Sequence, residues 1–420
     1  MIDFNPELLT LKSILFQHRS FHEAFFILKI NERVSSLRIE RAKARASFIL
    51  RHKESLSFEC RNLFPCYDIS QDEFLLSLIA LSVLRNEKAG EDDVRNAYCA
   101  TFQSMRMLGD MKKNVAVLLE AAKKPFIIPD EVKKSPCFYN SLVLEMPEFF
   151  LAELYKDYSL TEALSICRKL RSKTSIYYKS IDNKEVSDTR LNKVALTDGS
   201  FLYLSKDPIP TTEMKGEGLY SVHFVENEAM SHLGVSPLSS NVLIVGTKDV
   251  TSYLPFAYKI KECYQKQLIP VEEDSVKYRY AVNLSFQHHF DYVKPLCSSM
   301  DLLKTYLSYD SFETVVYFAK DSRVGLARRK PEILPSLEKR TFLTSVSKEK
   351  KELEESAMFV KKSGCLLFVS SSFFKKETEE VVSDFLSKRK DFSLEEERMV
   401  LGDASESDLG YYAILRRTKE

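Results

Sequence analysis

Polar residues suited to ligand binding or catalysis follow two apolar runs in the C-terminal part of the chain. The run at 315–318 leads into Lys-Asp-Ser-Arg at 320–323, and the run at 365–369 leads into three serines at 370–372. Short β-branched and aromatic runs bounded by polar residues predict buried strands that end in loops. In an open α/β sheet, ligands bind beyond the carboxyl ends of the strands. We therefore expect both loops to border one ligand site.

Two further strand ends add groups of the kind that hold a nucleotide cofactor. The apolar run at 242–245 leads into Gly246, and the run at 268–271 leads into Glu272 and Glu273. A glycine after a strand lets backbone N–H groups approach a cofactor closely, and an acid at the next strand end can accept a hydrogen bond from a ribose hydroxyl. A glutamate after a strand is also typical of a solvated helix start, and that interpretation stays open for both acids.

Two basic clusters could bind phosphate. One follows the loop at 320–323, and the other lies within 33–53, a run whose only acid is Glu40. Guanidinium groups suit bidentate phosphate contacts, although a charge run of this kind is more often a solvated helix face. The residues predicted to make such contacts are Arg328, Arg329, Lys330, Arg38, Arg41 and Arg45.

The pattern of apolar residues predicts the elements that position these groups. Residues 6–124 have apolar positions at helical spacing and few glycines, which predicts an all-helical region. A proline-rich break follows, and then short helices and strands. From Gly218 onward strands alternate with helices, which predicts a doubly wound α/β sheet with helices on both faces. We expect a short strand at 291–293 and a charged amphipathic helix at 348–360 among these elements. We divide the chain into a helical domain at 1–135, a small α+β module at 136–216 and an α/β domain at 217–420.

Composition bounds the class of protein. The chain has 420 residues, of which 44% are hydrophobic and 29% charged, a globular composition with room for two or three domains. Its 61 basic and 60 acidic residues nearly balance, so any basic surface must come from local clustering. Eight scattered cysteines without a CxxC predict reduced thiols, and the pair His18 and His22 has no third metal ligand nearby. We expect a cytoplasmic monomer with no bound metal and no membrane contact.

The order of parts and both strand ends resemble the Sun/Fmu (RsmB/NOP) family of RNA cytosine-C5 methyltransferases. The family's Asp-Ala-Pro-Cys-Ser-Gly-Thr-Gly run, with its following arginine pair and Pro-Asp-Ile, corresponds without a gap to residues 318–333. Its Gly-Gly-Thr-Leu-Val-Tyr-Ala-Thr-Cys-Ser run corresponds to residues 363–372. The resemblance implies a helical NusB-like domain, a small RNA-binding module and a Rossmann-like domain that uses S-adenosylmethionine. It also implies a ribosomal RNA partner, contacted by the six basic residues, and no DNA partner.

The departures from the family pattern bear on the chemistry. Ser371 stands at the position of the family's nucleophilic cysteine, and Asp321 at that of its second cysteine. A hydroxyl needs an adjacent base to attack, whereas cysteine is intrinsically nucleophilic, and a loss of four powers of ten in rate corresponds to about 5.4 kcal/mol. Gly246 is one glycine where the family has several, so we expect an eroded cofactor site. We predict an RNA-binding family member with impaired catalysis, a pseudoenzyme. Two alternatives are an active methyltransferase on a nitrogen or oxygen acceptor and a protein scaffold without an RNA role.

Overall fold

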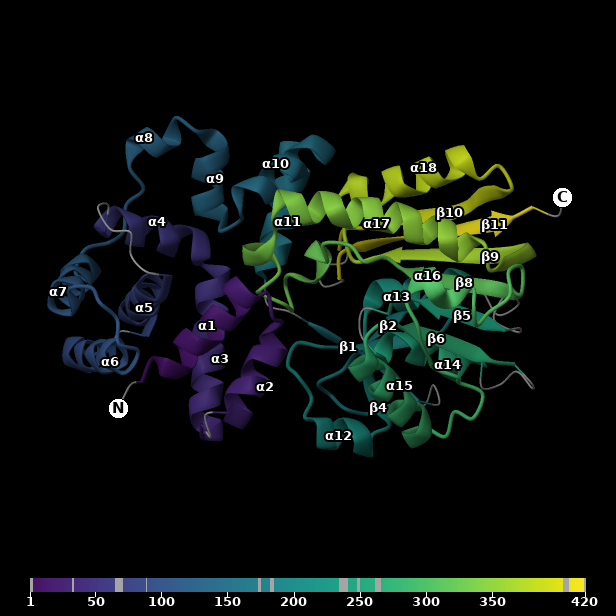
Figure 1. Cartoon of the computed structure of the whole chain (residues 1–420), viewed down its shortest axis with the longest axis horizontal. Helices are drawn as coiled ribbons and strands as arrows, with labels where there is room; N and C mark the ends of the chain where they lie inside the picture. Colours follow the sequence, from purple (N-terminus) through teal and green to yellow (C-terminus); the bar gives the residue numbers. More distant parts are fainter. Residues whose placement is uncertain are drawn as a thin grey trace. The chain divides into compact units, whose positions relative to one another are not determined.

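The computed structural model of the chain separates into two compact units (Figure 1). It describes residues 3–31, 34–64, 71–87, 89–172, 175–181, 185–233, 241–247, 250–260, 266–402 and 408–418. The first unit comprises Met1–Arg171 with Arg329–Glu338, and the second comprises Ser172–Arg328 with Lys339–Glu420. The division at residues 135 and 216 stays a prediction. Arg33, Cys66 and Cys263 lie outside the described residues.

The first unit is built from helices. They are α1 (Asn5–Gln17), α2 (Phe21–Asn31), α3 (Ser36–Arg51), α4 (Lys53–Leu63), α5 (Gln71–Ser82), α6 (Glu91–Ser104), α7 (Met111–Ala122), α8 (Asp130–Lys133), α9 (Pro136–Leu144), α10 (Glu148–Asp157) and α11 (Leu160–Arg171). This confirms the expectation of an N-terminal helical region, which extends past residue 124 to Arg171.

Helix α5 is the core of the first unit because it is apolar on every side. Its residues from Leu75 to Ser82 are all buried, as expected for a helix that has no solvent-facing stripe. The helix continues into a π-helical turn at Val83–Glu87. Arg85 of this turn donates to the carboxylate of Glu59 and, at 3.1 Å, to the carbonyl of Ala121. These bonds join the end of α5 to helices α4 and α7.

A short segment from later in the chain completes the first unit. It contains the 3₁₀ turn η5 (Leu334–Ser336). Its Glu332 accepts a hydrogen bond from the backbone N–H of Phe21 at 3.1 Å, and the carbonyl of Pro335 accepts one from Lys53 at 3.1 Å. Ile333 is buried in the same place, so apolar packing accompanies the polar contacts.

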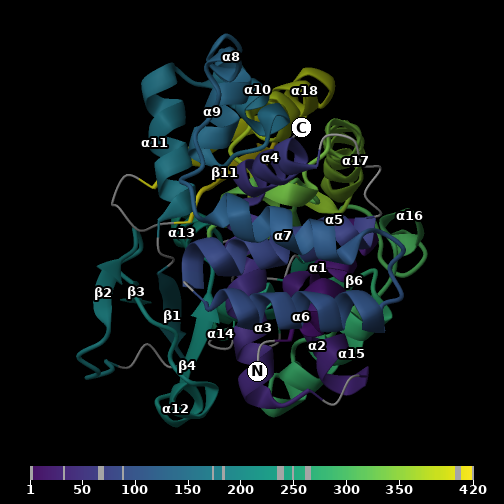
Figure 2. The same cartoon turned by 90° about the vertical axis from the view of Figure 1, so that its left-hand side faces the viewer.

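The second unit begins with a four-stranded antiparallel sheet in the order β2-β3-β1-β4 (Figure 2). Its strands are β1 (Ile176–Ser180), β2 (Asn192–Ala195), β3 (Phe201–Ser205) and β4 (Leu219–Val222). Helix α12 (Thr211–Gly216) connects β3 to β4, and helix α13 (Phe224–Leu233) follows β4. Alternate residues point to opposite faces, as the pleat requires. Tyr177 joins the main core of the unit, whereas Tyr178 packs with Tyr203 and Ile209 on the other face.

The larger sheet of this unit has seven strands in the order β10-β11-β9-β8-β5-β6-β7. They are β5 (Val242–Val245), β6 (Leu268–Glu272), β7 (Leu296–Cys297), β8 (Phe312–Phe318), β9 (Val360–Ser370), β10 (Phe392–Val400) and β11 (Gly410–Arg417). The strands from β9 across to β7 run parallel, and β11 is antiparallel to both of its neighbours. From β5 the chain adds β6 and β7 on one side of the sheet, and it then returns to add β8 and β9 on the other side of β5. The strand order therefore reverses between β5 and β8. Ligands bind at such a switch point.

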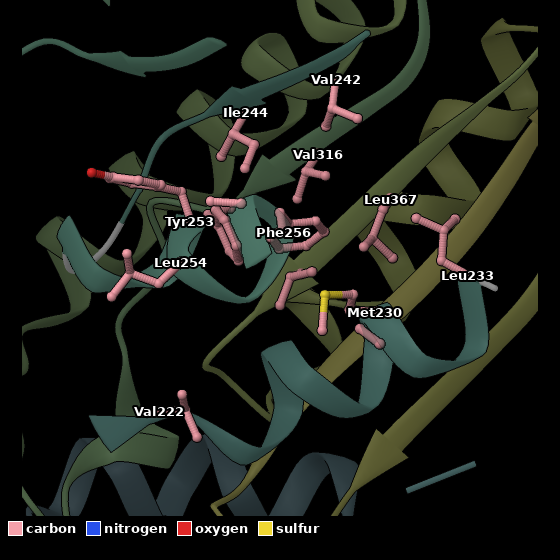
Figure 3. Packing of buried hydrophobic residues seen from close by; sticks show 14 of the residues in the cluster. Val222, Met230, Leu233, Val242, Ile244, Tyr253, Leu254, Phe256, Val316 and Leu367 are labelled. Carbon is pink, nitrogen blue, oxygen red and sulfur yellow. The ribbon is translucent and has the colours of Figure 1, made fainter. Parts of the chain in front are cut away.

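Helices cover both faces of the larger sheet, which confirms the predicted doubly wound fold. One face packs against α13, α14 (Leu254–Ile260) and α15 (Ser275–Gln287), and the other against α16 (Met300–Leu303), α17 (Lys339–Ala357) and α18 (Glu379–Lys388). Figure 3 shows Met230 of α13 and Phe256 of α14 packed toward Val316 and Leu367 of the strands. Short 3₁₀ turns are η3 (Val250–Tyr253), η4 (Val324–Leu326) and η6 (Lys375–Glu377).

Several predicted elements need correction. A strand expected at 291–293 is only an isolated bridge from Val293 to Leu268, and the adjoining strand is β7. The helix expected at 348–360 begins earlier, at Lys339, and ends at Ala357, where the chain turns into β9. Strand β10 was not predicted, because its acidic stretch hides the alternation that a strand with one buried face would show. As an edge strand it exposes most of its residues. Among the described helices, none is long and apolar enough to cross a membrane.

Substitution of Phe318 tests whether this side chain packs in the core beneath the loop at 320–323. Its side chain is 0% exposed and meets Phe256 edge-on at 6.4 Å between ring centroids. We expect Phe318→Ala to lower the free energy of unfolding by about 3–5 kcal/mol, measured by urea unfolding, because it leaves a cavity. Phe286→Ala, at a side chain that is 82% exposed on α15, is the matched control and should change it by less than about 0.5 kcal/mol. Equal effects of the two changes would contradict the core position of Phe318.

Candidate functional site

A pocket of about 510 Å³ lies at the carboxyl ends of β5, β6 and β8. Its lining residues are Val245, Gly246, Thr247, Val271, Glu272, Glu273, Asp274, Lys277, Ser298, Met300, Ala319, Lys320, Asp321, Arg323 and Glu352. Parallel pairing brings these strand ends together, which is why residues far apart in sequence share one pocket. The position is the strand-order switch point, and the volume is in the usual range for small-molecule sites. All three residues predicted to hold a cofactor, Gly246, Glu272 and Glu273, line it.

Gly246 closes the floor of the pocket at a place where no side chain fits. Its φ is +78°, and a Cβ atom added there would lie 2.5 Å from the backbone oxygen of Phe318. Only glycine adopts this conformation without strain and allows the two backbones to approach so closely. Phe318 itself points into the hydrophobic core and does not fill the pocket. Lys248 and Asp249, which continue this loop, lie outside the described residues.

Both acids after β6 have intramolecular partners. Glu272 is 3% exposed, and its carboxylate accepts a hydrogen bond from the hydroxyl of Thr247. Glu273 accepts one from Lys320 at 2.7 Å, and this bond, together with the lysine's charge, lowers the pKa of Glu273. The position of Glu273 at a pocket edge makes its ion pair partly solvated, and such pairs contribute about 0–1 kcal/mol. A ligand hydroxyl could therefore displace Lys320 from Glu273 at little cost.

Lys320 joins the pocket to helix α17. Besides Glu273, its ammonium group contacts the carboxylate of Glu352 at 3.2 Å, and Tyr317 donates its hydroxyl to the other oxygen of Glu352 at 3.2 Å. Glu352 is 5% exposed at the side chain, so this lysine compensates a carboxylate that is otherwise removed from water. Lysine occupies the position of the family's proline here, and it introduces a positive charge among the pocket's acids.

Asp321 links the ends of β8 and β9. One carboxylate oxygen accepts hydrogen bonds from the backbone N–H of Ser371 at 2.6 Å and from the hydroxyl of Ser370 at 2.7 Å. The other oxygen accepts the backbone N–H of Arg323 at 2.8 Å. The two positions that correspond to the family cysteines therefore lie side by side, as the predicted alignment requires. The acid at one of them binds the backbone of the other.

A second buried acid supports the same loop. Glu377 is 0% exposed and accepts hydrogen bonds from the backbone N–H of Ser322 at 2.8 Å and from its hydroxyl at 2.5 Å. Burial and the nearby charge of Asp321 raise the pKa of Glu377 to about 7. Two acids so close in a buried loop disfavour double ionisation, so Glu377 holds a proton at mildly acidic pH.

The described cysteines do not supply a replacement nucleophile, since no cysteine is among the residues that line the pocket. Cys365 lies in β9, where it is 0% exposed and burial raises its pKa to about 12. Such a thiol stays protonated at neutral pH and packs as a small apolar side chain. Groups of three or more His, Cys, Asp or Glu side chains placed to hold a metal ion are also absent among the described residues.

The six basic residues predicted to bind phosphate divide into different environments. Arg328 is 4% exposed, and Arg328, Arg329 and Lys330 all lie outside the pocket lining, so the expected basic border is formed by Lys277, Lys320 and Arg323 instead. Burial of the chain through η4 is the physical reason: it directs Arg328 into the protein. Arg328 is therefore unsuited to a surface phosphate contact.

The three arginines of helix α3 also differ from one another. The guanidinium of Arg45 is 12% exposed and already binds Glu7 at 2.8 Å and Glu87 at 2.6 Å, so its predicted role as a phosphate contact is not supported. Arg38 is 54% exposed and lies 3.6 Å from Asp3. Arg41 is also exposed, and the described residues provide it with no ion pair. Arg38 and Arg41 remain the accessible members of the run.

Part of the second unit matches a protein-family model. Residues 265–415 match the family model described as 16S rRNA methyltransferase RsmB/F. This part of the second unit is therefore similar in sequence to the RsmB/F methyltransferases. The match covers the lining residues from Val271 to Glu352, and it ends within β11. No curated protein matches the chain by sequence.

Solved structures are similar to this chain in fold. PH0851 superposes with a TM-score of 0.78 over 99% of this chain and 99% of its own, at 13% identity. A methyltransferase homologue from Pyrococcus horikoshii gives 0.54 over 69% and 100%, at 13% identity. NSun6 from Pyrococcus horikoshii with SFG gives 0.51 over 65% and 98%, at 10% identity. At these identities the likeness concerns the fold alone.

The pocket contains residues that sequence reasoning did not select. They are Thr247, Lys277, Ser298 and Glu352, whereas Lys320 belongs to the loop that was expected to border the site. Glu352 comes from a charged helix face, where its sequence context predicts solvent. Its burial follows from Lys320 and Tyr317, which meet it only in the folded domain.

Gly246 and Gly199 offer a matched test of the pocket floor. Both have left-handed backbones, with φ of +78° and +79°, but a Cβ atom at Gly199 would meet nothing within 4 Å. We expect Gly199→Ala to cost about 1 kcal/mol of unfolding free energy through backbone strain alone. Gly246→Ala should cost clearly more, because the added atom also collides with the backbone at Phe318. Chemical unfolding of the two variants measures the difference, and equal losses would contradict the close approach.

The raised pKa of Glu377 predicts that the stability of the folded protein depends on pH. This pKa of about 7 in the folded protein exceeds the ordinary value of 4.5, so between these values the folded state holds a proton that the unfolded state releases. The contribution of Glu377 therefore disfavours the folded state increasingly as pH rises from about 4.5 to about 7. Urea unfolding across this range should show a smaller fall for Glu377→Gln than for the wild type. Glu380→Gln, at an exposed position on α18, should follow the wild type.

Proposed function

We propose that this protein is an RNA-binding member of the RsmB/F methyltransferase family that does not methylate cytosine C5 through a cysteine adduct. The observation that carries the proposal is the pairing of Asp321 with the backbone of Ser371 at 2.6 Å. The two positions that correspond to the family cysteines adjoin one another, and neither bears a thiol. Because attack on C6 of cytosine depends on an intrinsically strong nucleophile, this arrangement favours binding without that chemistry.

The pocket supports retention of a nucleoside-bearing ligand, for which S-adenosylmethionine is the family's candidate. Gly246 would bring the backbone close to the ligand, and Glu273 would accept a ribose hydroxyl after releasing Lys320. When bound, that cofactor supplies an electrophilic methyl group. The chain's own residues would orient it and keep it at the strand ends. The predicted erosion, inferred from a single glycine, would then lower affinity without closing the site.

An RNA partner follows from the family, and ribosomal RNA is the class to test first. On the first unit, exposed Arg38 and Arg41 are three residues apart on α3, close to one helical turn, so both can face one segment of RNA backbone. Their guanidinium groups would bind phosphates without reading sequence. The three-part organisation, with a NusB-like first domain, and a cytoplasmic monomer remain parts of the proposal.

A second candidate function is methyl transfer to a nitrogen or oxygen acceptor. The open pocket favours it, because such acceptors need no enzyme thiolate. A protein scaffold without an RNA role is the remaining alternative, and it predicts no salt-dependent binding to RNA.

An assay of methyl transfer distinguishes RNA binding without cysteine-type catalysis from methylation of a nitrogen or oxygen acceptor. The wild type and Ser371→Ala should incorporate equally little label from S-adenosylmethionine into small-subunit ribosomal RNA, if the protein binds without thiolate-type catalysis. Robust transfer by the wild type that Ser371→Ala abolishes would refute the proposal. Transfer that survives in Ser371→Ala would support the nitrogen or oxygen acceptor. Protection by S-adenosylhomocysteine in thermal unfolding reports cofactor binding separately, since a ligand at 100 times its Kd stabilises by about 2.7 kcal/mol.

RNA binding across a salt series tests the proposed surface. The Arg38→Ala/Arg41→Ala double variant should bind more weakly and lower the slope of log K against log salt by about 2, one for each phosphate contact removed. Arg95→Ala is the control, because Arg95 is half exposed on α6 and already paired with Asp92 at 2.9 Å. If wild-type binding shows no salt dependence, the scaffold alternative gains. A double variant that binds as the control does would place the RNA surface elsewhere.

A further inference from the structure

Two buried hydrogen-bond donors lie side by side in the four-stranded sheet, away from the pocket. Lys179 of β1 is 7% exposed and Tyr220 of β4 is 8% exposed. The antiparallel register places these two residues directly opposite each other, so their side chains stand on the same face of the sheet. Within the part of the chain that the structure describes, no group accepts a hydrogen bond from the buried Tyr220 hydroxyl. The Lys179 ammonium has no hydrogen bond or ion pair to the described residues, and it is not among the side-chain atoms closed to solvent.

The surroundings of this pair carry an excess of positive charge. Lys259 of α14 is 17% exposed at the side chain and binds Asp198 at 2.9 Å. Asp198 and Lys259 are the charged groups that act on Lys179, so two lysines share one carboxylate. Burial, opposed by Asp198 and assisted by Lys259, lowers the pKa of Lys179 to about 8. The lysine thus remains mostly charged at neutral pH without a counter-ion of its own.

The ring of Tyr220 is held in place independently of its hydroxyl. It stacks on Tyr258 with 5.2 Å between the ring centroids, and Tyr258 donates to or accepts from His288 at 2.6 Å. The hydroxyl therefore sits on a fixed ring next to Lys179 rather than on a mobile side chain. Fixed, paired donors are the arrangement that protein sites use for oxygen acceptors.

The Tyr220 hydroxyl is a buried donor without a partner, and nearly all buried polar groups in folded proteins have one. The Lys179 ammonium on the opposite strand is a charged donor that is likewise open to a partner. Since both groups are donors, the missing partner is an acceptor. A water molecule could accept both bonds but would leave the charge uncompensated, whereas an anion satisfies both requirements. We propose that Lys179 and Tyr220, with Lys259 nearby, form a binding site for an oxyanion of the phosphate class.

The phosphate could come from two sources, a free ion or a phosphodiester of RNA. The limited exposure of Lys179 and Tyr220 restricts access to one small group in either case. The site lies on elements outside the pocket, so it is independent of whether the protein binds a cofactor or transfers methyl groups.

Thermal unfolding of the full chain over a titration of inorganic phosphate tests the site. Phosphate also stabilises proteins generally by exclusion from their surface, so the comparison among variants is the readout. The wild type should gain a saturable rise in Tm that Lys179→Met lacks. Tyr220→Phe, which keeps the stacked ring, should retain the rise with a Kd about tenfold weaker. Lys362→Met, at an exposed lysine of β9, should behave as the wild type.

In phosphate-free buffer, Lys179→Met should melt above the wild type, because burial disfavours the charged form of this lysine in the folded state. A phosphate response of the same size in the wild type, Lys179→Met and Tyr220→Phe would overturn the proposal. If Lys179→Met does not fold, the shift in Kd of Tyr220→Phe decides the matter. A parallel titration with an oligouridylate distinguishes the sources: weaker oligonucleotide binding by Tyr220→Phe identifies the RNA backbone as the source, and unchanged binding identifies the free ion.

Discussion

The carboxylate of Asp321 is the interaction on which the candidate site depends. Two parallel strands, β8 and β9, end beside each other, and their last residues leave the ladder with backbone groups that need partners. One oxygen of Asp321 satisfies Ser370 and Ser371, and the other satisfies the backbone of Arg323. The loop that forms one wall of the pocket is thereby fixed to the neighbouring strand, and Glu377 fixes it again through Ser322. A polar loop at the edge of a buried sheet becomes an ordered wall in this way.

This bonding gives a physical meaning to the replaced cysteines. An aspartate and serines make short hydrogen bonds that thiols make poorly, so the exchange of residue types trades reactive groups for structural ones. The pocket beside them is retained, because its shape depends on Gly246 and on the backbone of Phe318, neither of which takes part in thiol chemistry. A ligand pocket can therefore lie beside serine and aspartate at this sheet edge without depending on a thiol.

Sequence reasoning succeeded where one strong periodicity controls the structure. The buried parallel strands at 242–245 and 268–271 are continuous apolar runs, and their ends located Gly246, Glu272 and Glu273 in the pocket. It failed where partners come from distant segments. The charge of Arg45 suggested a phosphate contact, but Glu7 and Glu87 are brought to it only by helix packing. Arg328 likewise reads as a surface cation until the fold buries it. Strand β10 was missed because an edge strand lacks the apolar alternation on which strand prediction relies.

The segment Arg329–Glu338 has a consequence for the order of events during synthesis. It belongs to the first unit, yet it follows most of the second unit's parallel strands in the chain. The partners of Phe21 and Lys53 in this segment leave the ribosome only after β5, β6 and β8 have done so. The helical unit therefore cannot reach its final packing before much of the second unit has emerged. Neither unit corresponds to one uninterrupted stretch of sequence, so a single cut between them would leave the helical unit incomplete.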